Sequence, residues 1–438
     1  MSAFIWRHHS LIMIRTTLLF LALTLIVACD AKKLGTVPDV EKAIVVTADW
    51  PTFRGADRSD MSTETGLLKT WPVEGLKRVW LNESAGLGYS GYSIVGGTLY
   101  TLGARDAVEY VIAIDAATGK EKWSAEAGAL LTNGWGDGPR STPTVDGGKV
   151  YALSGKGILV CLEAVDGKEL WRASLTDLGG KVPGWGYCES PLIVGDFVVV
   201  TPGGSQGTLA AFDKSTGMKA WQSEGWTDGA QYASAIAVDH NGVKQIIQLT
   251  MQSIAGVNAV NGEVLWRTEF PGKTAVIPTP IFSEGQVFVA AGYGVGCKSV
   301  KIGPGNTVEE IYANTDMVNH HGGVILYQGH LYGYSDKGGW TCLDFKTGAV
   351  KWQENKALRK GAIHFADGMF YLLEEKTGVV VLIEASPEAW KEKGRFSLAP
   401  QTTQRNPKGM IWTHPVVSGG KLFLRDQELL FCFDVSGK

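Results

Sequence analysis

The hydrophobic and polar residues of this chain recur in one short pattern. An apolar stretch ends at Asp, Glu or Asn, a Gly follows four residues later, and a Trp follows four residues after the Gly. The pattern ends at Trp123, Trp171, Trp221, Trp266 and Trp352, as in YVIAIDAATGKEKW and GWTCLDFKTGAVKW. Alternating apolar residues predict a strand, and a Gly that adopts positive φ predicts a tight hairpin. The pattern therefore predicts a series of β-hairpins whose second strand carries the Trp.

Each column of this repeat has a physical reason. Ten residues before the Trp stands a small residue, Ala, Cys or Gly, which leaves room where strands crowd. The Asp or Asn side chain is expected to bond to main-chain N–H groups of the turn, and the Trp ring to fill the space between neighbouring sheets. The expected sheet-docking residues are Trp80, Trp123, Trp171, Trp221, Trp266, Trp352 and Trp390.

The number of repeats predicts the architecture. Tyr312 and Trp390 end two weaker copies, while the C-terminal LLFCFDVSGK lacks its Trp half, which the segment ending at Trp80 supplies. Eight units at a mean spacing of about 44 residues fit four-stranded propeller blades. We therefore expect an all-β fold over residues 49–438. It is an eight-bladed β-propeller of four-stranded blades, whose ring is closed by pairing of the N- and C-terminal strands.

The N-terminus predicts export. An apolar run over residues 18–28 follows Arg7 and Arg15. The run is too short to cross a bilayer, which needs about 20 residues, but it suits the hydrophobic region of a secretory signal peptide. Translation is expected to start at Met1 or at Met13, because either start leaves a complete signal.

The letters IVAC at the end of this run resemble the lipobox of bacterial lipoproteins. In a lipobox the Cys is acylated and becomes the mature N-terminus, here Cys29. We expect a lipoprotein signal peptide over residues 1–28, a flexible tether over residues 29–48 and the propeller over residues 49–438. Cleavage near residue 28 without lipidation is the alternative. The expected location is the periplasm or the surface of a bacterium, at a membrane.

Composition and charge narrow the function classes. The 438 residues include 41 Lys and Arg against 44 Asp and Glu, and this net charge of −3 argues against a nucleic-acid-binding protein. Of the six Cys, Cys161, Cys342 and Cys432 occupy the small-residue column and are expected to be buried. Cys188 and Cys297 lie outside that column and are expected either to face each other or to remain free.

The innermost strands of the expected blades begin at one mouth of the central channel, where a concave ligand site can form. The residues next to these strand starts are polar or ionisable, and the loops leading to them carry Trp. The candidate ligand-binding residues are Arg140, Glu189, Gln231, His320, His321, Lys360, His414, Trp135, Trp185, Trp226 and Trp412. They form either a funnel for a planar or sugar-like ligand or a solvated polar network. No metal site is expected, because adjacent residues such as His320 and His321 point to opposite faces of an extended segment. A metal held across the channel by His414 and one of these two is the alternative.

The Ala/Cys-x-Asp-x-x-Thr-Gly-x-x-x-Trp repeat resembles that of the pyrroloquinoline-quinone (PQQ) repeat family, also called PQQ-binding-like, over about residues 50–438. The resemblance implies an eight-bladed propeller. The family includes quinone-dependent alcohol dehydrogenases and BamB-type lipoproteins, which have no cofactor and act as scaffolds in outer-membrane protein assembly. The dehydrogenases typically carry two adjacent Cys over the quinone, whereas no two Cys are adjacent here. A Cys-x-x-Cys-His haem motif is also absent.

The sequence therefore favours a non-catalytic, lipid-anchored binding or scaffold protein of the cell envelope, without a cofactor. Its expected partner is an envelope protein or a small extracytoplasmic ligand, with no nucleic acid and no membrane contact beyond the anchor. A monomer is expected, because a closed ring leaves no free sheet edge. The alternative is a dehydrogenase that oxidises an alcohol or sugar with PQQ and calcium in the channel. The residues suited to that alternative by type are Arg140, Lys360, Trp185, Glu189, Asn319 and Asp316.

Overall fold

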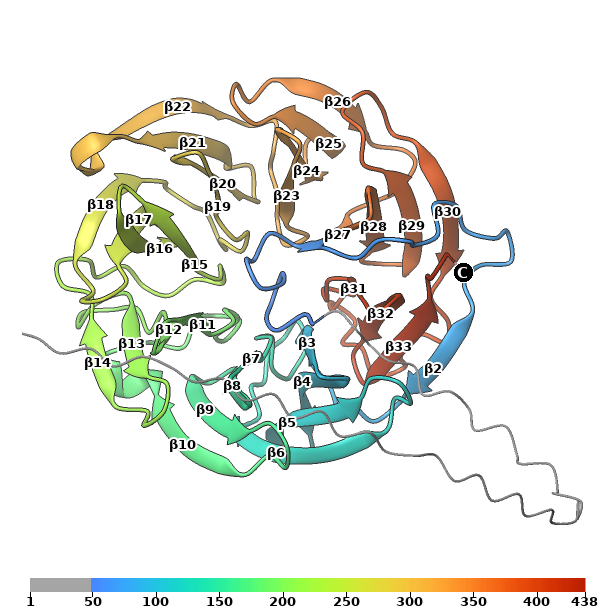
Figure 1. Cartoon of the computed structure of the whole chain (residues 1–438), viewed down its shortest axis with the longest axis horizontal. Coiled ribbons are helices and arrows are strands. Elements are labelled where there is room, and N and C mark those ends of the chain that lie inside the picture. Colours follow the sequence, from blue (N-terminus) through green and yellow to red (C-terminus); the bar gives the residue numbers. More distant parts are fainter. Residues whose placement is uncertain (1–48, 438) are drawn as a thin grey trace, which may run out of the picture. The chain divides into compact units, whose positions relative to one another are not determined.

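Eight blades of four antiparallel strands surround a common centre in the computed structural model, which describes residues 49–437 (Figure 1). A short fifth strand, β1 (Met61–Ser62), adds to the sheet of one blade in parallel. The predicted eight-bladed β-propeller is thereby confirmed. The predicted signal peptide, the lipidated Cys29 and the tether over residues 29–48 lie outside the described residues. No helix among residues 49–437 is long and apolar enough to cross a membrane.

Seven blades are continuous in sequence. Blade one contains β3 (Tyr92–Val95), β4 (Thr98–Arg105), β5 (Val108–Asp115) and β6 (Glu121–Ala129). Blade two contains β7 (Thr144–Asp146), β8 (Lys149–Leu153), β9 (Ile158–Glu163) and β10 (Glu169–Ser174). Blade three contains β11 (Leu192–Val194), β12 (Phe197–Val200), β13 (Ala210–Asp213) and β14 (Lys219–Gln222). Blade four contains β15 (Ile236–His240), β16 (Val243–Leu249), β17 (Ser253–Asn258) and β18 (Val264–Glu269).

The second half of the ring repeats this order. Blade five contains β19 (Ile281–Ser283), β20 (Gln286–Ala291), β21 (Gly296–Ile302) and β22 (Val308–Asn314). Blade six contains β23 (Val324–Tyr327), β24 (His330–Ser335), β25 (Gly339–Asp344) and β26 (Val350–Glu354). Blade seven contains β27 (Gly361–Ala366), β28 (Met369–Glu374), β29 (Val379–Glu384) and β30 (Glu392–Ser397). Blade eight contains β31 (Val416–Ser418), β32 (Lys421–Asp426), β33 (Leu429–Asp434) and β2 (Arg78–Asn82). Two short 3₁₀ helices, η1 (Leu175–Leu178) and η2 (Pro304–Asn306), lie in connections.

The Gly of the repeat lies under the Trp ring of the preceding blade. A Cβ atom placed on Gly167 would meet the Trp123 ring at 2.5 Å, and one placed on Gly217 would meet the Trp171 ring at 2.6 Å. Both glycines also have positive φ, 75° and 73°. The column therefore requires Gly for two reasons: the left-handed backbone of the turn and the close approach of the neighbouring ring.

The Trp column joins adjacent blades as predicted, and several of its indoles donate a hydrogen bond to a main-chain oxygen of the next blade. The donor–acceptor pairs are Trp80–Ala116, Trp123–Ala164, Trp171–Lys214 and Trp352–Ser386, with Nε1–O distances of 3.0, 3.1, 3.2 and 2.9 Å. Trp266 instead donates to Gln245 Oε1 of its own blade at 2.8 Å. In the weaker fifth copy, Tyr312 holds this position, and its hydroxyl donates to Phe345 O of blade six at 3.0 Å.

Blade seven departs from the predicted pattern. The assignment of Trp390 to the docking column was wrong, because Gly394 occupies the equivalent position of β30, opposite Leu382. Trp390 lies before that strand and packs on Trp340 of blade six, with ring centroids 6.4 Å apart. The space beside Gly394 is taken by Trp71, whose Cβ lies 2.5 Å from the position of a Cβ on that Gly. A Trp from the segment before β2 therefore replaces the missing repeat Trp.

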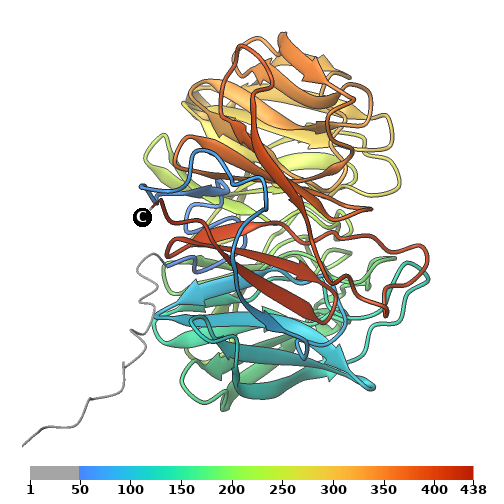
Figure 2. The ribbon, with the colours of Figure 1, turned by 90° about the vertical axis from the view of Figure 1, so that its right-hand side faces the viewer.

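The two ends of the described chain close the ring. β2 pairs antiparallel with β33, with Trp80 opposite Cys432, and the blue and red strands lie side by side in both views (Figures 1 and 2). Cys161, Cys342 and Cys432 are buried, as predicted. Cys188 and Cys297 are both free thiols, which decides between the two expectations for this pair.

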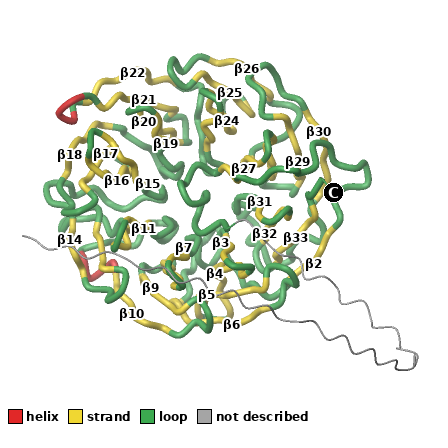
Figure 3. The backbone as a smooth tube through the Cα atoms, viewed as in Figure 1, coloured by secondary structure: helices red, strands yellow, loops and turns green. Residues whose placement is uncertain are grey.

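A segment of the chain that precedes β2, residues 50–62, runs through the centre of the ring (Figures 1 and 3). We call residues 50–62 the plug. Trp50 forms an isolated antiparallel bridge with Ile94 of blade one, and Arg58 donates to Ala235 O at the start of blade four at 2.6 Å. The plug ends at β1 (Met61–Ser62), which pairs in parallel with β27 of blade seven. The segment thus contacts blades on opposite sides of the ring.

Candidate functional site

A cavity of about 380 Å³ lies where the innermost strands of the blades begin. The plug contributes Trp50, Phe53, Arg54 and Asp60 to its lining. Every blade except the seventh contributes residues from its strand start or from the loop that leads to it. The expected concave site at one mouth of the channel is therefore present, with the plug as part of its wall.

The structure brings together seven of the eleven candidate residues around this cavity. They are Arg140, His320, His321, His414, Trp135, Trp185 and Trp412. The other four, Glu189, Gln231, Lys360 and Trp226, are absent from the lining.

Two of these four are buried in blade contacts. Trp226 is fully buried, and its Nε1 donates to Ser253 Oγ at 3.1 Å, which anchors the loop between blades three and four. Glu189 accepts hydrogen bonds from the main-chain N–H and, at 2.7 Å, the hydroxyl of Thr201. Burial raises the pKa of Glu189 to about 7, although the bonds from Thr201 and the nearby Arg58 oppose the rise.

The other two are held by polar partners outside the cavity. Lys360 Nζ lies 2.7 Å from Asp336 Oδ1. The Gln231 side-chain oxygen accepts a hydrogen bond from Val276 N at 3.2 Å. Both residues had the expected polarity at a strand start, but each side chain is engaged with a neighbour rather than with the central space.

Aromatic side chains form much of the cavity wall and are fixed by their neighbours. Trp412 Nε1 donates to Glu375 Oε2 at 3.0 Å, and its ring lies 4.9 Å from the Tyr89 ring. The Tyr89 hydroxyl donates to Trp135 O at 2.9 Å. Trp185 packs edge-on against Tyr232 with ring centroids 5.7 Å apart. These contacts pair the ring of Trp412 with that of Tyr89 and the ring of Trp185 with that of Tyr232, whereas Trp135 is 45% exposed.

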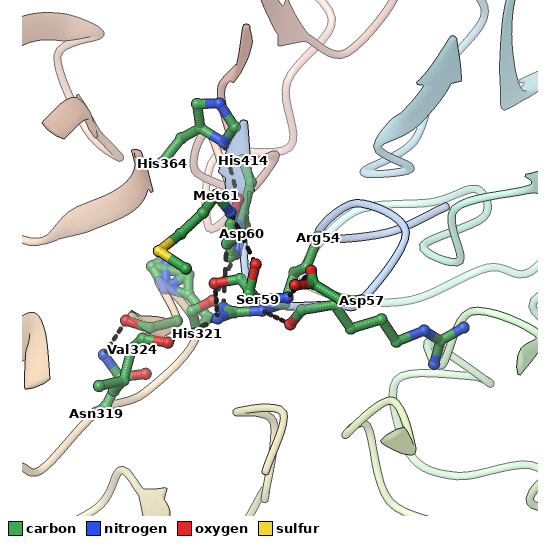
Figure 4. A network of polar contacts seen from close by, with 12 residues as sticks. Arg54, Asp57, Ser59, Asp60, Met61, Asn319, His321, Val324, His364 and His414 are labelled. Atoms are coloured by element: carbon green, nitrogen blue, oxygen red, sulfur yellow. Dashed lines mark hydrogen bonds and ion pairs between the residues drawn. The ribbon is translucent and has the colours of Figure 1, made fainter. Parts of the chain in front are cut away.

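The plug holds the carboxylate that lines the cavity, that of Asp60 (Figure 4). Arg54 Nη1 lies 3.4 Å from Asp60 Oδ2, and His414 Nδ1 lies 3.3 Å from the same oxygen. His364 accepts from Val417 N through Nε2, so that its Nδ1–H donates to Asp60 Oδ1 at 2.9 Å. Burial alone would raise the pKa of Asp60, but Arg54 and the two histidine contacts outweigh burial and hold it below its usual range. Asp60 is therefore an ionised, fully engaged carboxylate.

His320 and His321 were expected to point to opposite faces of an extended segment, but both line the cavity and their ring centroids lie 5.3 Å apart. Burial, with a contribution from Lys360, lowers the pKa of His320 to about 4. Burial and the neighbouring His320 also lower the pKa of His321 well below its ordinary value. Both imidazoles are consequently neutral near pH 7. Within residues 49–437, no cluster of three or more His, Cys, Asp or Glu is arranged to hold a metal ion.

The residues suited by type to PQQ and calcium do not converge on one place. Of the six, only Arg140 and Trp185 line the cavity. Asn319 donates to two main-chain oxygens, and Asp316 lies 3.5 Å from Lys337. The oxygen donors that a calcium ion requires are thus dispersed among these blades. These six residues therefore do not together form a PQQ–calcium centre.

Sequence reasoning missed the contribution of the plug. Arg54, Arg58 and Asp60 are all buried, and each has a positive φ, 65°, 59° and 65°. Positive φ is uncommon for residues other than Gly and costs conformational energy. Their sequence neighbours, WPTFRGADRSD, show no strand or helix period that would have indicated a buried segment. Cys188, which lines the cavity as a free thiol, was likewise not assigned to it.

Comparison with known proteins identifies the family. A family model described as "Outer membrane protein assembly factor BamB" matches residues 77–354, which is more than half of the chain. The chain belongs to this BamB family of PQQ-repeat propellers. The match includes the first through sixth blades and the closing strand β2.

Individual relatives are named for different functions. Tetrathionate hydrolase of Acidithiobacillus ferrooxidans is 24% identical over 302 residues, which are 68% of this chain and 52% of that protein. BamB of Burkholderia pseudomallei is 33% identical over 184 residues, 41% of each protein. Quinohemoprotein alcohol dehydrogenase ADH IIB of Pseudomonas putida is 31% identical over 119 residues, 26% of this chain and 17% of that protein. The chain spans about half the length, or less, of each of these curated relatives.

Solved structures agree on the fold. BamB from Moraxella catarrhalis superposes with a TM-score of 0.59 at 15% identity, over 82% of this chain and 99% of that one. The quinohemoprotein alcohol dehydrogenase from Comamonas testosteroni gives 0.62 at 13% identity, over 91% of this chain and 82% of that one. At these identities the likeness shows that all three chains are propellers of one type.

Proposed function

We propose that this BamB-family propeller is a non-catalytic binding or scaffold protein of the bacterial cell envelope. One observation carries the proposal: the central cavity presents fixed aromatic faces, while its lining carboxylate, Asp60, is fully engaged by Arg54, His364 and His414. Such a cavity can hold a ligand, while the carboxylate in its lining is not free to act as a general base. Export and lipidation at Cys29 would keep the ring at a membrane, facing the periplasm or the cell exterior.

The family membership supports this role at the level of the whole molecule. The matching model is described as an outer membrane protein assembly factor, and this description favours a role in binding other envelope proteins. A closed ring of eight blades displays many loops around one rigid frame, which suits a scaffold. The proposed partners are therefore an envelope protein on the loops, a small ligand in the cavity, or both.

A quinone-dependent dehydrogenase is the second candidate. It is favoured by the 31% identity to ADH IIB over 119 residues and by the presence of Arg140 and Trp185 in the cavity lining. The dispersed positions of Glu189, Asn319 and Asp316 weigh against it, because PQQ enzymes need calcium close to the quinone.

Thermal unfolding with PQQ and Ca²⁺ separates the two functions. The protein lacking residues 1–28 is titrated with each alone and with both together. We expect no change in melting temperature. A dehydrogenase centre would bind both, and a ligand at 100 times its Kd stabilises a fold by about 2.7 kcal/mol. A saturable, Ca²⁺-dependent rise in melting temperature would therefore overturn the proposal and justify screening alcohols and sugars.

A further inference from the structure

Among the described residues, the lining of the central cavity contains one Arg that forms no ion pair. Arg54 and Arg140 both line it. Arg54 is paired with Asp60, with 3.4 Å between Nη1 and Oδ2. Arg140, in contrast, bonds only to main-chain oxygens, and within residues 49–437 no carboxylate forms an ion pair with it.

The guanidinium of Arg140 is fixed before any ligand arrives. Its Nη1 donates to Gly138 O and its Nη2 to Gly136 O, both at 2.7 Å. Its central carbon also lies 5.0 Å from the centroid of the Tyr89 ring. An Arg side chain has five N–H donors, so three remain for an anion. An oriented fork of this kind suits a carboxylate.

Other walls of the cavity carry buried polar atoms without a protein partner. They include the Tyr92 hydroxyl, the Thr279 hydroxyl and Nδ1 of His321. Tyr92 and Thr279 are 1% and 5% exposed, and the His321 side chain is 9% exposed. Nε2 of His321 lies 2.9 Å from Glu375 Oε2 but makes no hydrogen bond in that direction. Buried polar groups are nearly always bonded in native proteins, so these atoms point to a ligand with its own polar group.

The charge of the lining matches a ligand with a single negative charge. His320 and His321 are neutral near pH 7, because burial lowers both pKa values. The Arg54 and Asp60 charges offset each other. Arg140 is therefore the one Arg of the described lining without an ion pair, and a ligand with several carboxylates would bring anions that no second unpaired Arg of the lining meets.

We propose that the cavity binds a small planar aromatic monocarboxylate. Its carboxylate lies on the free N–H groups of Arg140, its ring lies among Trp135, Trp185 and Trp412, and a polar substituent reaches Thr279 or His321. A cavity of about 380 Å³ is within the range that holds small ligands. This inference rests on the proposed binding function and names the chemical class of the ligand.

Four related acids and esters test each part of the proposal. The probes are 4-hydroxycinnamate, cinnamate, methyl 4-hydroxycinnamate and 3-cyclohexylpropanoate, titrated into the protein lacking residues 1–28 by calorimetry and by quenching of Trp fluorescence. We expect saturable binding of 4-hydroxycinnamate. The uncharged ester and the non-aromatic acid should each bind at least tenfold more weakly. Equal binding of the ester or of the cyclohexyl acid overturns the proposal, as does the absence of saturable binding by either cinnamate.

Matched variants assign the contacts. Arg140→Gln should weaken binding of 4-hydroxycinnamate at least tenfold and leave binding of its ester unchanged. Arg172→Gln removes an exposed Arg that pairs with Glu169 away from the cavity, and it should change neither. Unchanged binding of the acid by Arg140→Gln overturns the proposal.

Thr279→Val covers the case in which the Arg140 variant fails to fold, because it removes one unbonded hydroxyl at nearly constant volume. Together with His321→Phe, it tests the polar end of the site. At least one of the two should bind 4-hydroxycinnamate several-fold more weakly while binding cinnamate as before. Full retention of 4-hydroxycinnamate affinity in both overturns this placement. The PQQ experiment distinguishes failure of the two proposals. A Ca²⁺-dependent rise in melting temperature with PQQ overturns the proposed binding function. No effect of PQQ together with no binding of the aromatic acids overturns only the proposed ligand class.

Discussion

At the scale of single residues, two glycines allow the free-energy cost of backbone strain to be measured apart from the cost of a clash with the Trp of the preceding blade. Gly167 and Gly147 both have positive φ, 75° and 54°. A Cβ on Gly167 would meet the Trp123 ring at 2.5 Å, whereas a Cβ on Gly147 would meet nothing within 4 Å. Gly147→Ala should therefore cost about 1 kcal/mol for backbone strain. Gly167→Ala should cost about 1–3 kcal/mol more for overpacking, as measured by urea unfolding. Equal losses of stability in the two variants would show that the Trp123 ring moves aside at no cost in free energy.

Glu189 predicts a pH dependence of stability. Its folded pKa of about 7 lies above its ordinary value of 4.5, and burial is the main cause. Between pH 4.5 and 7 the folded protein therefore binds a proton that the unfolded chain has lost. The free energy of unfolding contributed by this group falls as pH rises through that window, by at most about 1.4 kcal/mol per pH unit.

Replacing Glu189 by Gln isolates this contribution from that of the buried histidines, which act in the opposite direction. The free energy of unfolding is measured for both proteins at pH 5, 6, 7 and 8. The variant should gain stability relative to the original protein as pH rises from 5 to 7. A difference that stays constant with pH would mean that Glu189 does not titrate in this range.

At the scale of elements, the plug is held chiefly by buried Arg side chains. Arg58 donates to Ala235 O at 2.6 Å, to Pro191 O at 2.7 Å and to Ser190 O at 2.9 Å. Arg58→Met would leave the oxygens of Ala235 and Ser190 without their donor, at about 1–3 kcal/mol each if unrelieved, while Pro191 O keeps the bond from the Thr144 hydroxyl. We expect a loss of at least about 2 kcal/mol in urea unfolding. The exposed control Arg172→Met should change stability by less than about 0.5 kcal/mol. A variant of Arg58 as stable as this control would show that the plug is not held by these bonds.

The blades were predictable from sequence because the residues that shape each hairpin lie close together in the chain. The Asp, Gly and Trp of a repeat lie within nine residues, and Asp115 accepts from Thr118 N at 2.8 Å inside the same turn. The plug was not predictable in this way, since Arg58 bonds to oxygens 132–177 residues away. The same reason explains Trp390: spacing alone placed it in the docking column, whereas Trp71, more than 300 residues earlier, fills that space.

Only part of the cavity lining could be predicted from the sequence, because contacts with distant residues also decide where a side chain points. Strand starts placed Arg140, His320, His321 and His414 correctly, because the first strand of every blade begins at the same mouth. The direction of a side chain at such a start depends on its neighbours, and the hydrogen bond of Trp226 to Ser253 turns its indole into the blades. No pattern in the loop sequence distinguishes Trp226 from Trp185.

At the scale of the whole molecule, one segment both closes the ring and fills its centre. Residues 49–83 contain the plug and β2, which pairs with β33 from the other end of the chain. A protein that begins at residue 84 would therefore expose the edge of β33, including the positions opposite Trp80 and Leu81, and would lack the bonds of Arg54 and Arg58 to the blades. An unpaired strand edge is a template for association between chains.

We expect residues 84–438 alone to form large aggregates in sedimentation velocity and to lack the near-ultraviolet circular dichroism of packed Trp. Co-expression with a separate peptide of residues 49–83 should restore a single folded species, because the segment is held by non-covalent pairing on both sides of the ring. A peptide in which Arg54 and Arg58 are both Met serves as the control. It retains β2 but loses the buried donors of the plug, so it should restore less of the folded species. A stable, monodisperse protein of residues 84–438 with its melting temperature unchanged would refute the role of this segment in holding the eight blades together.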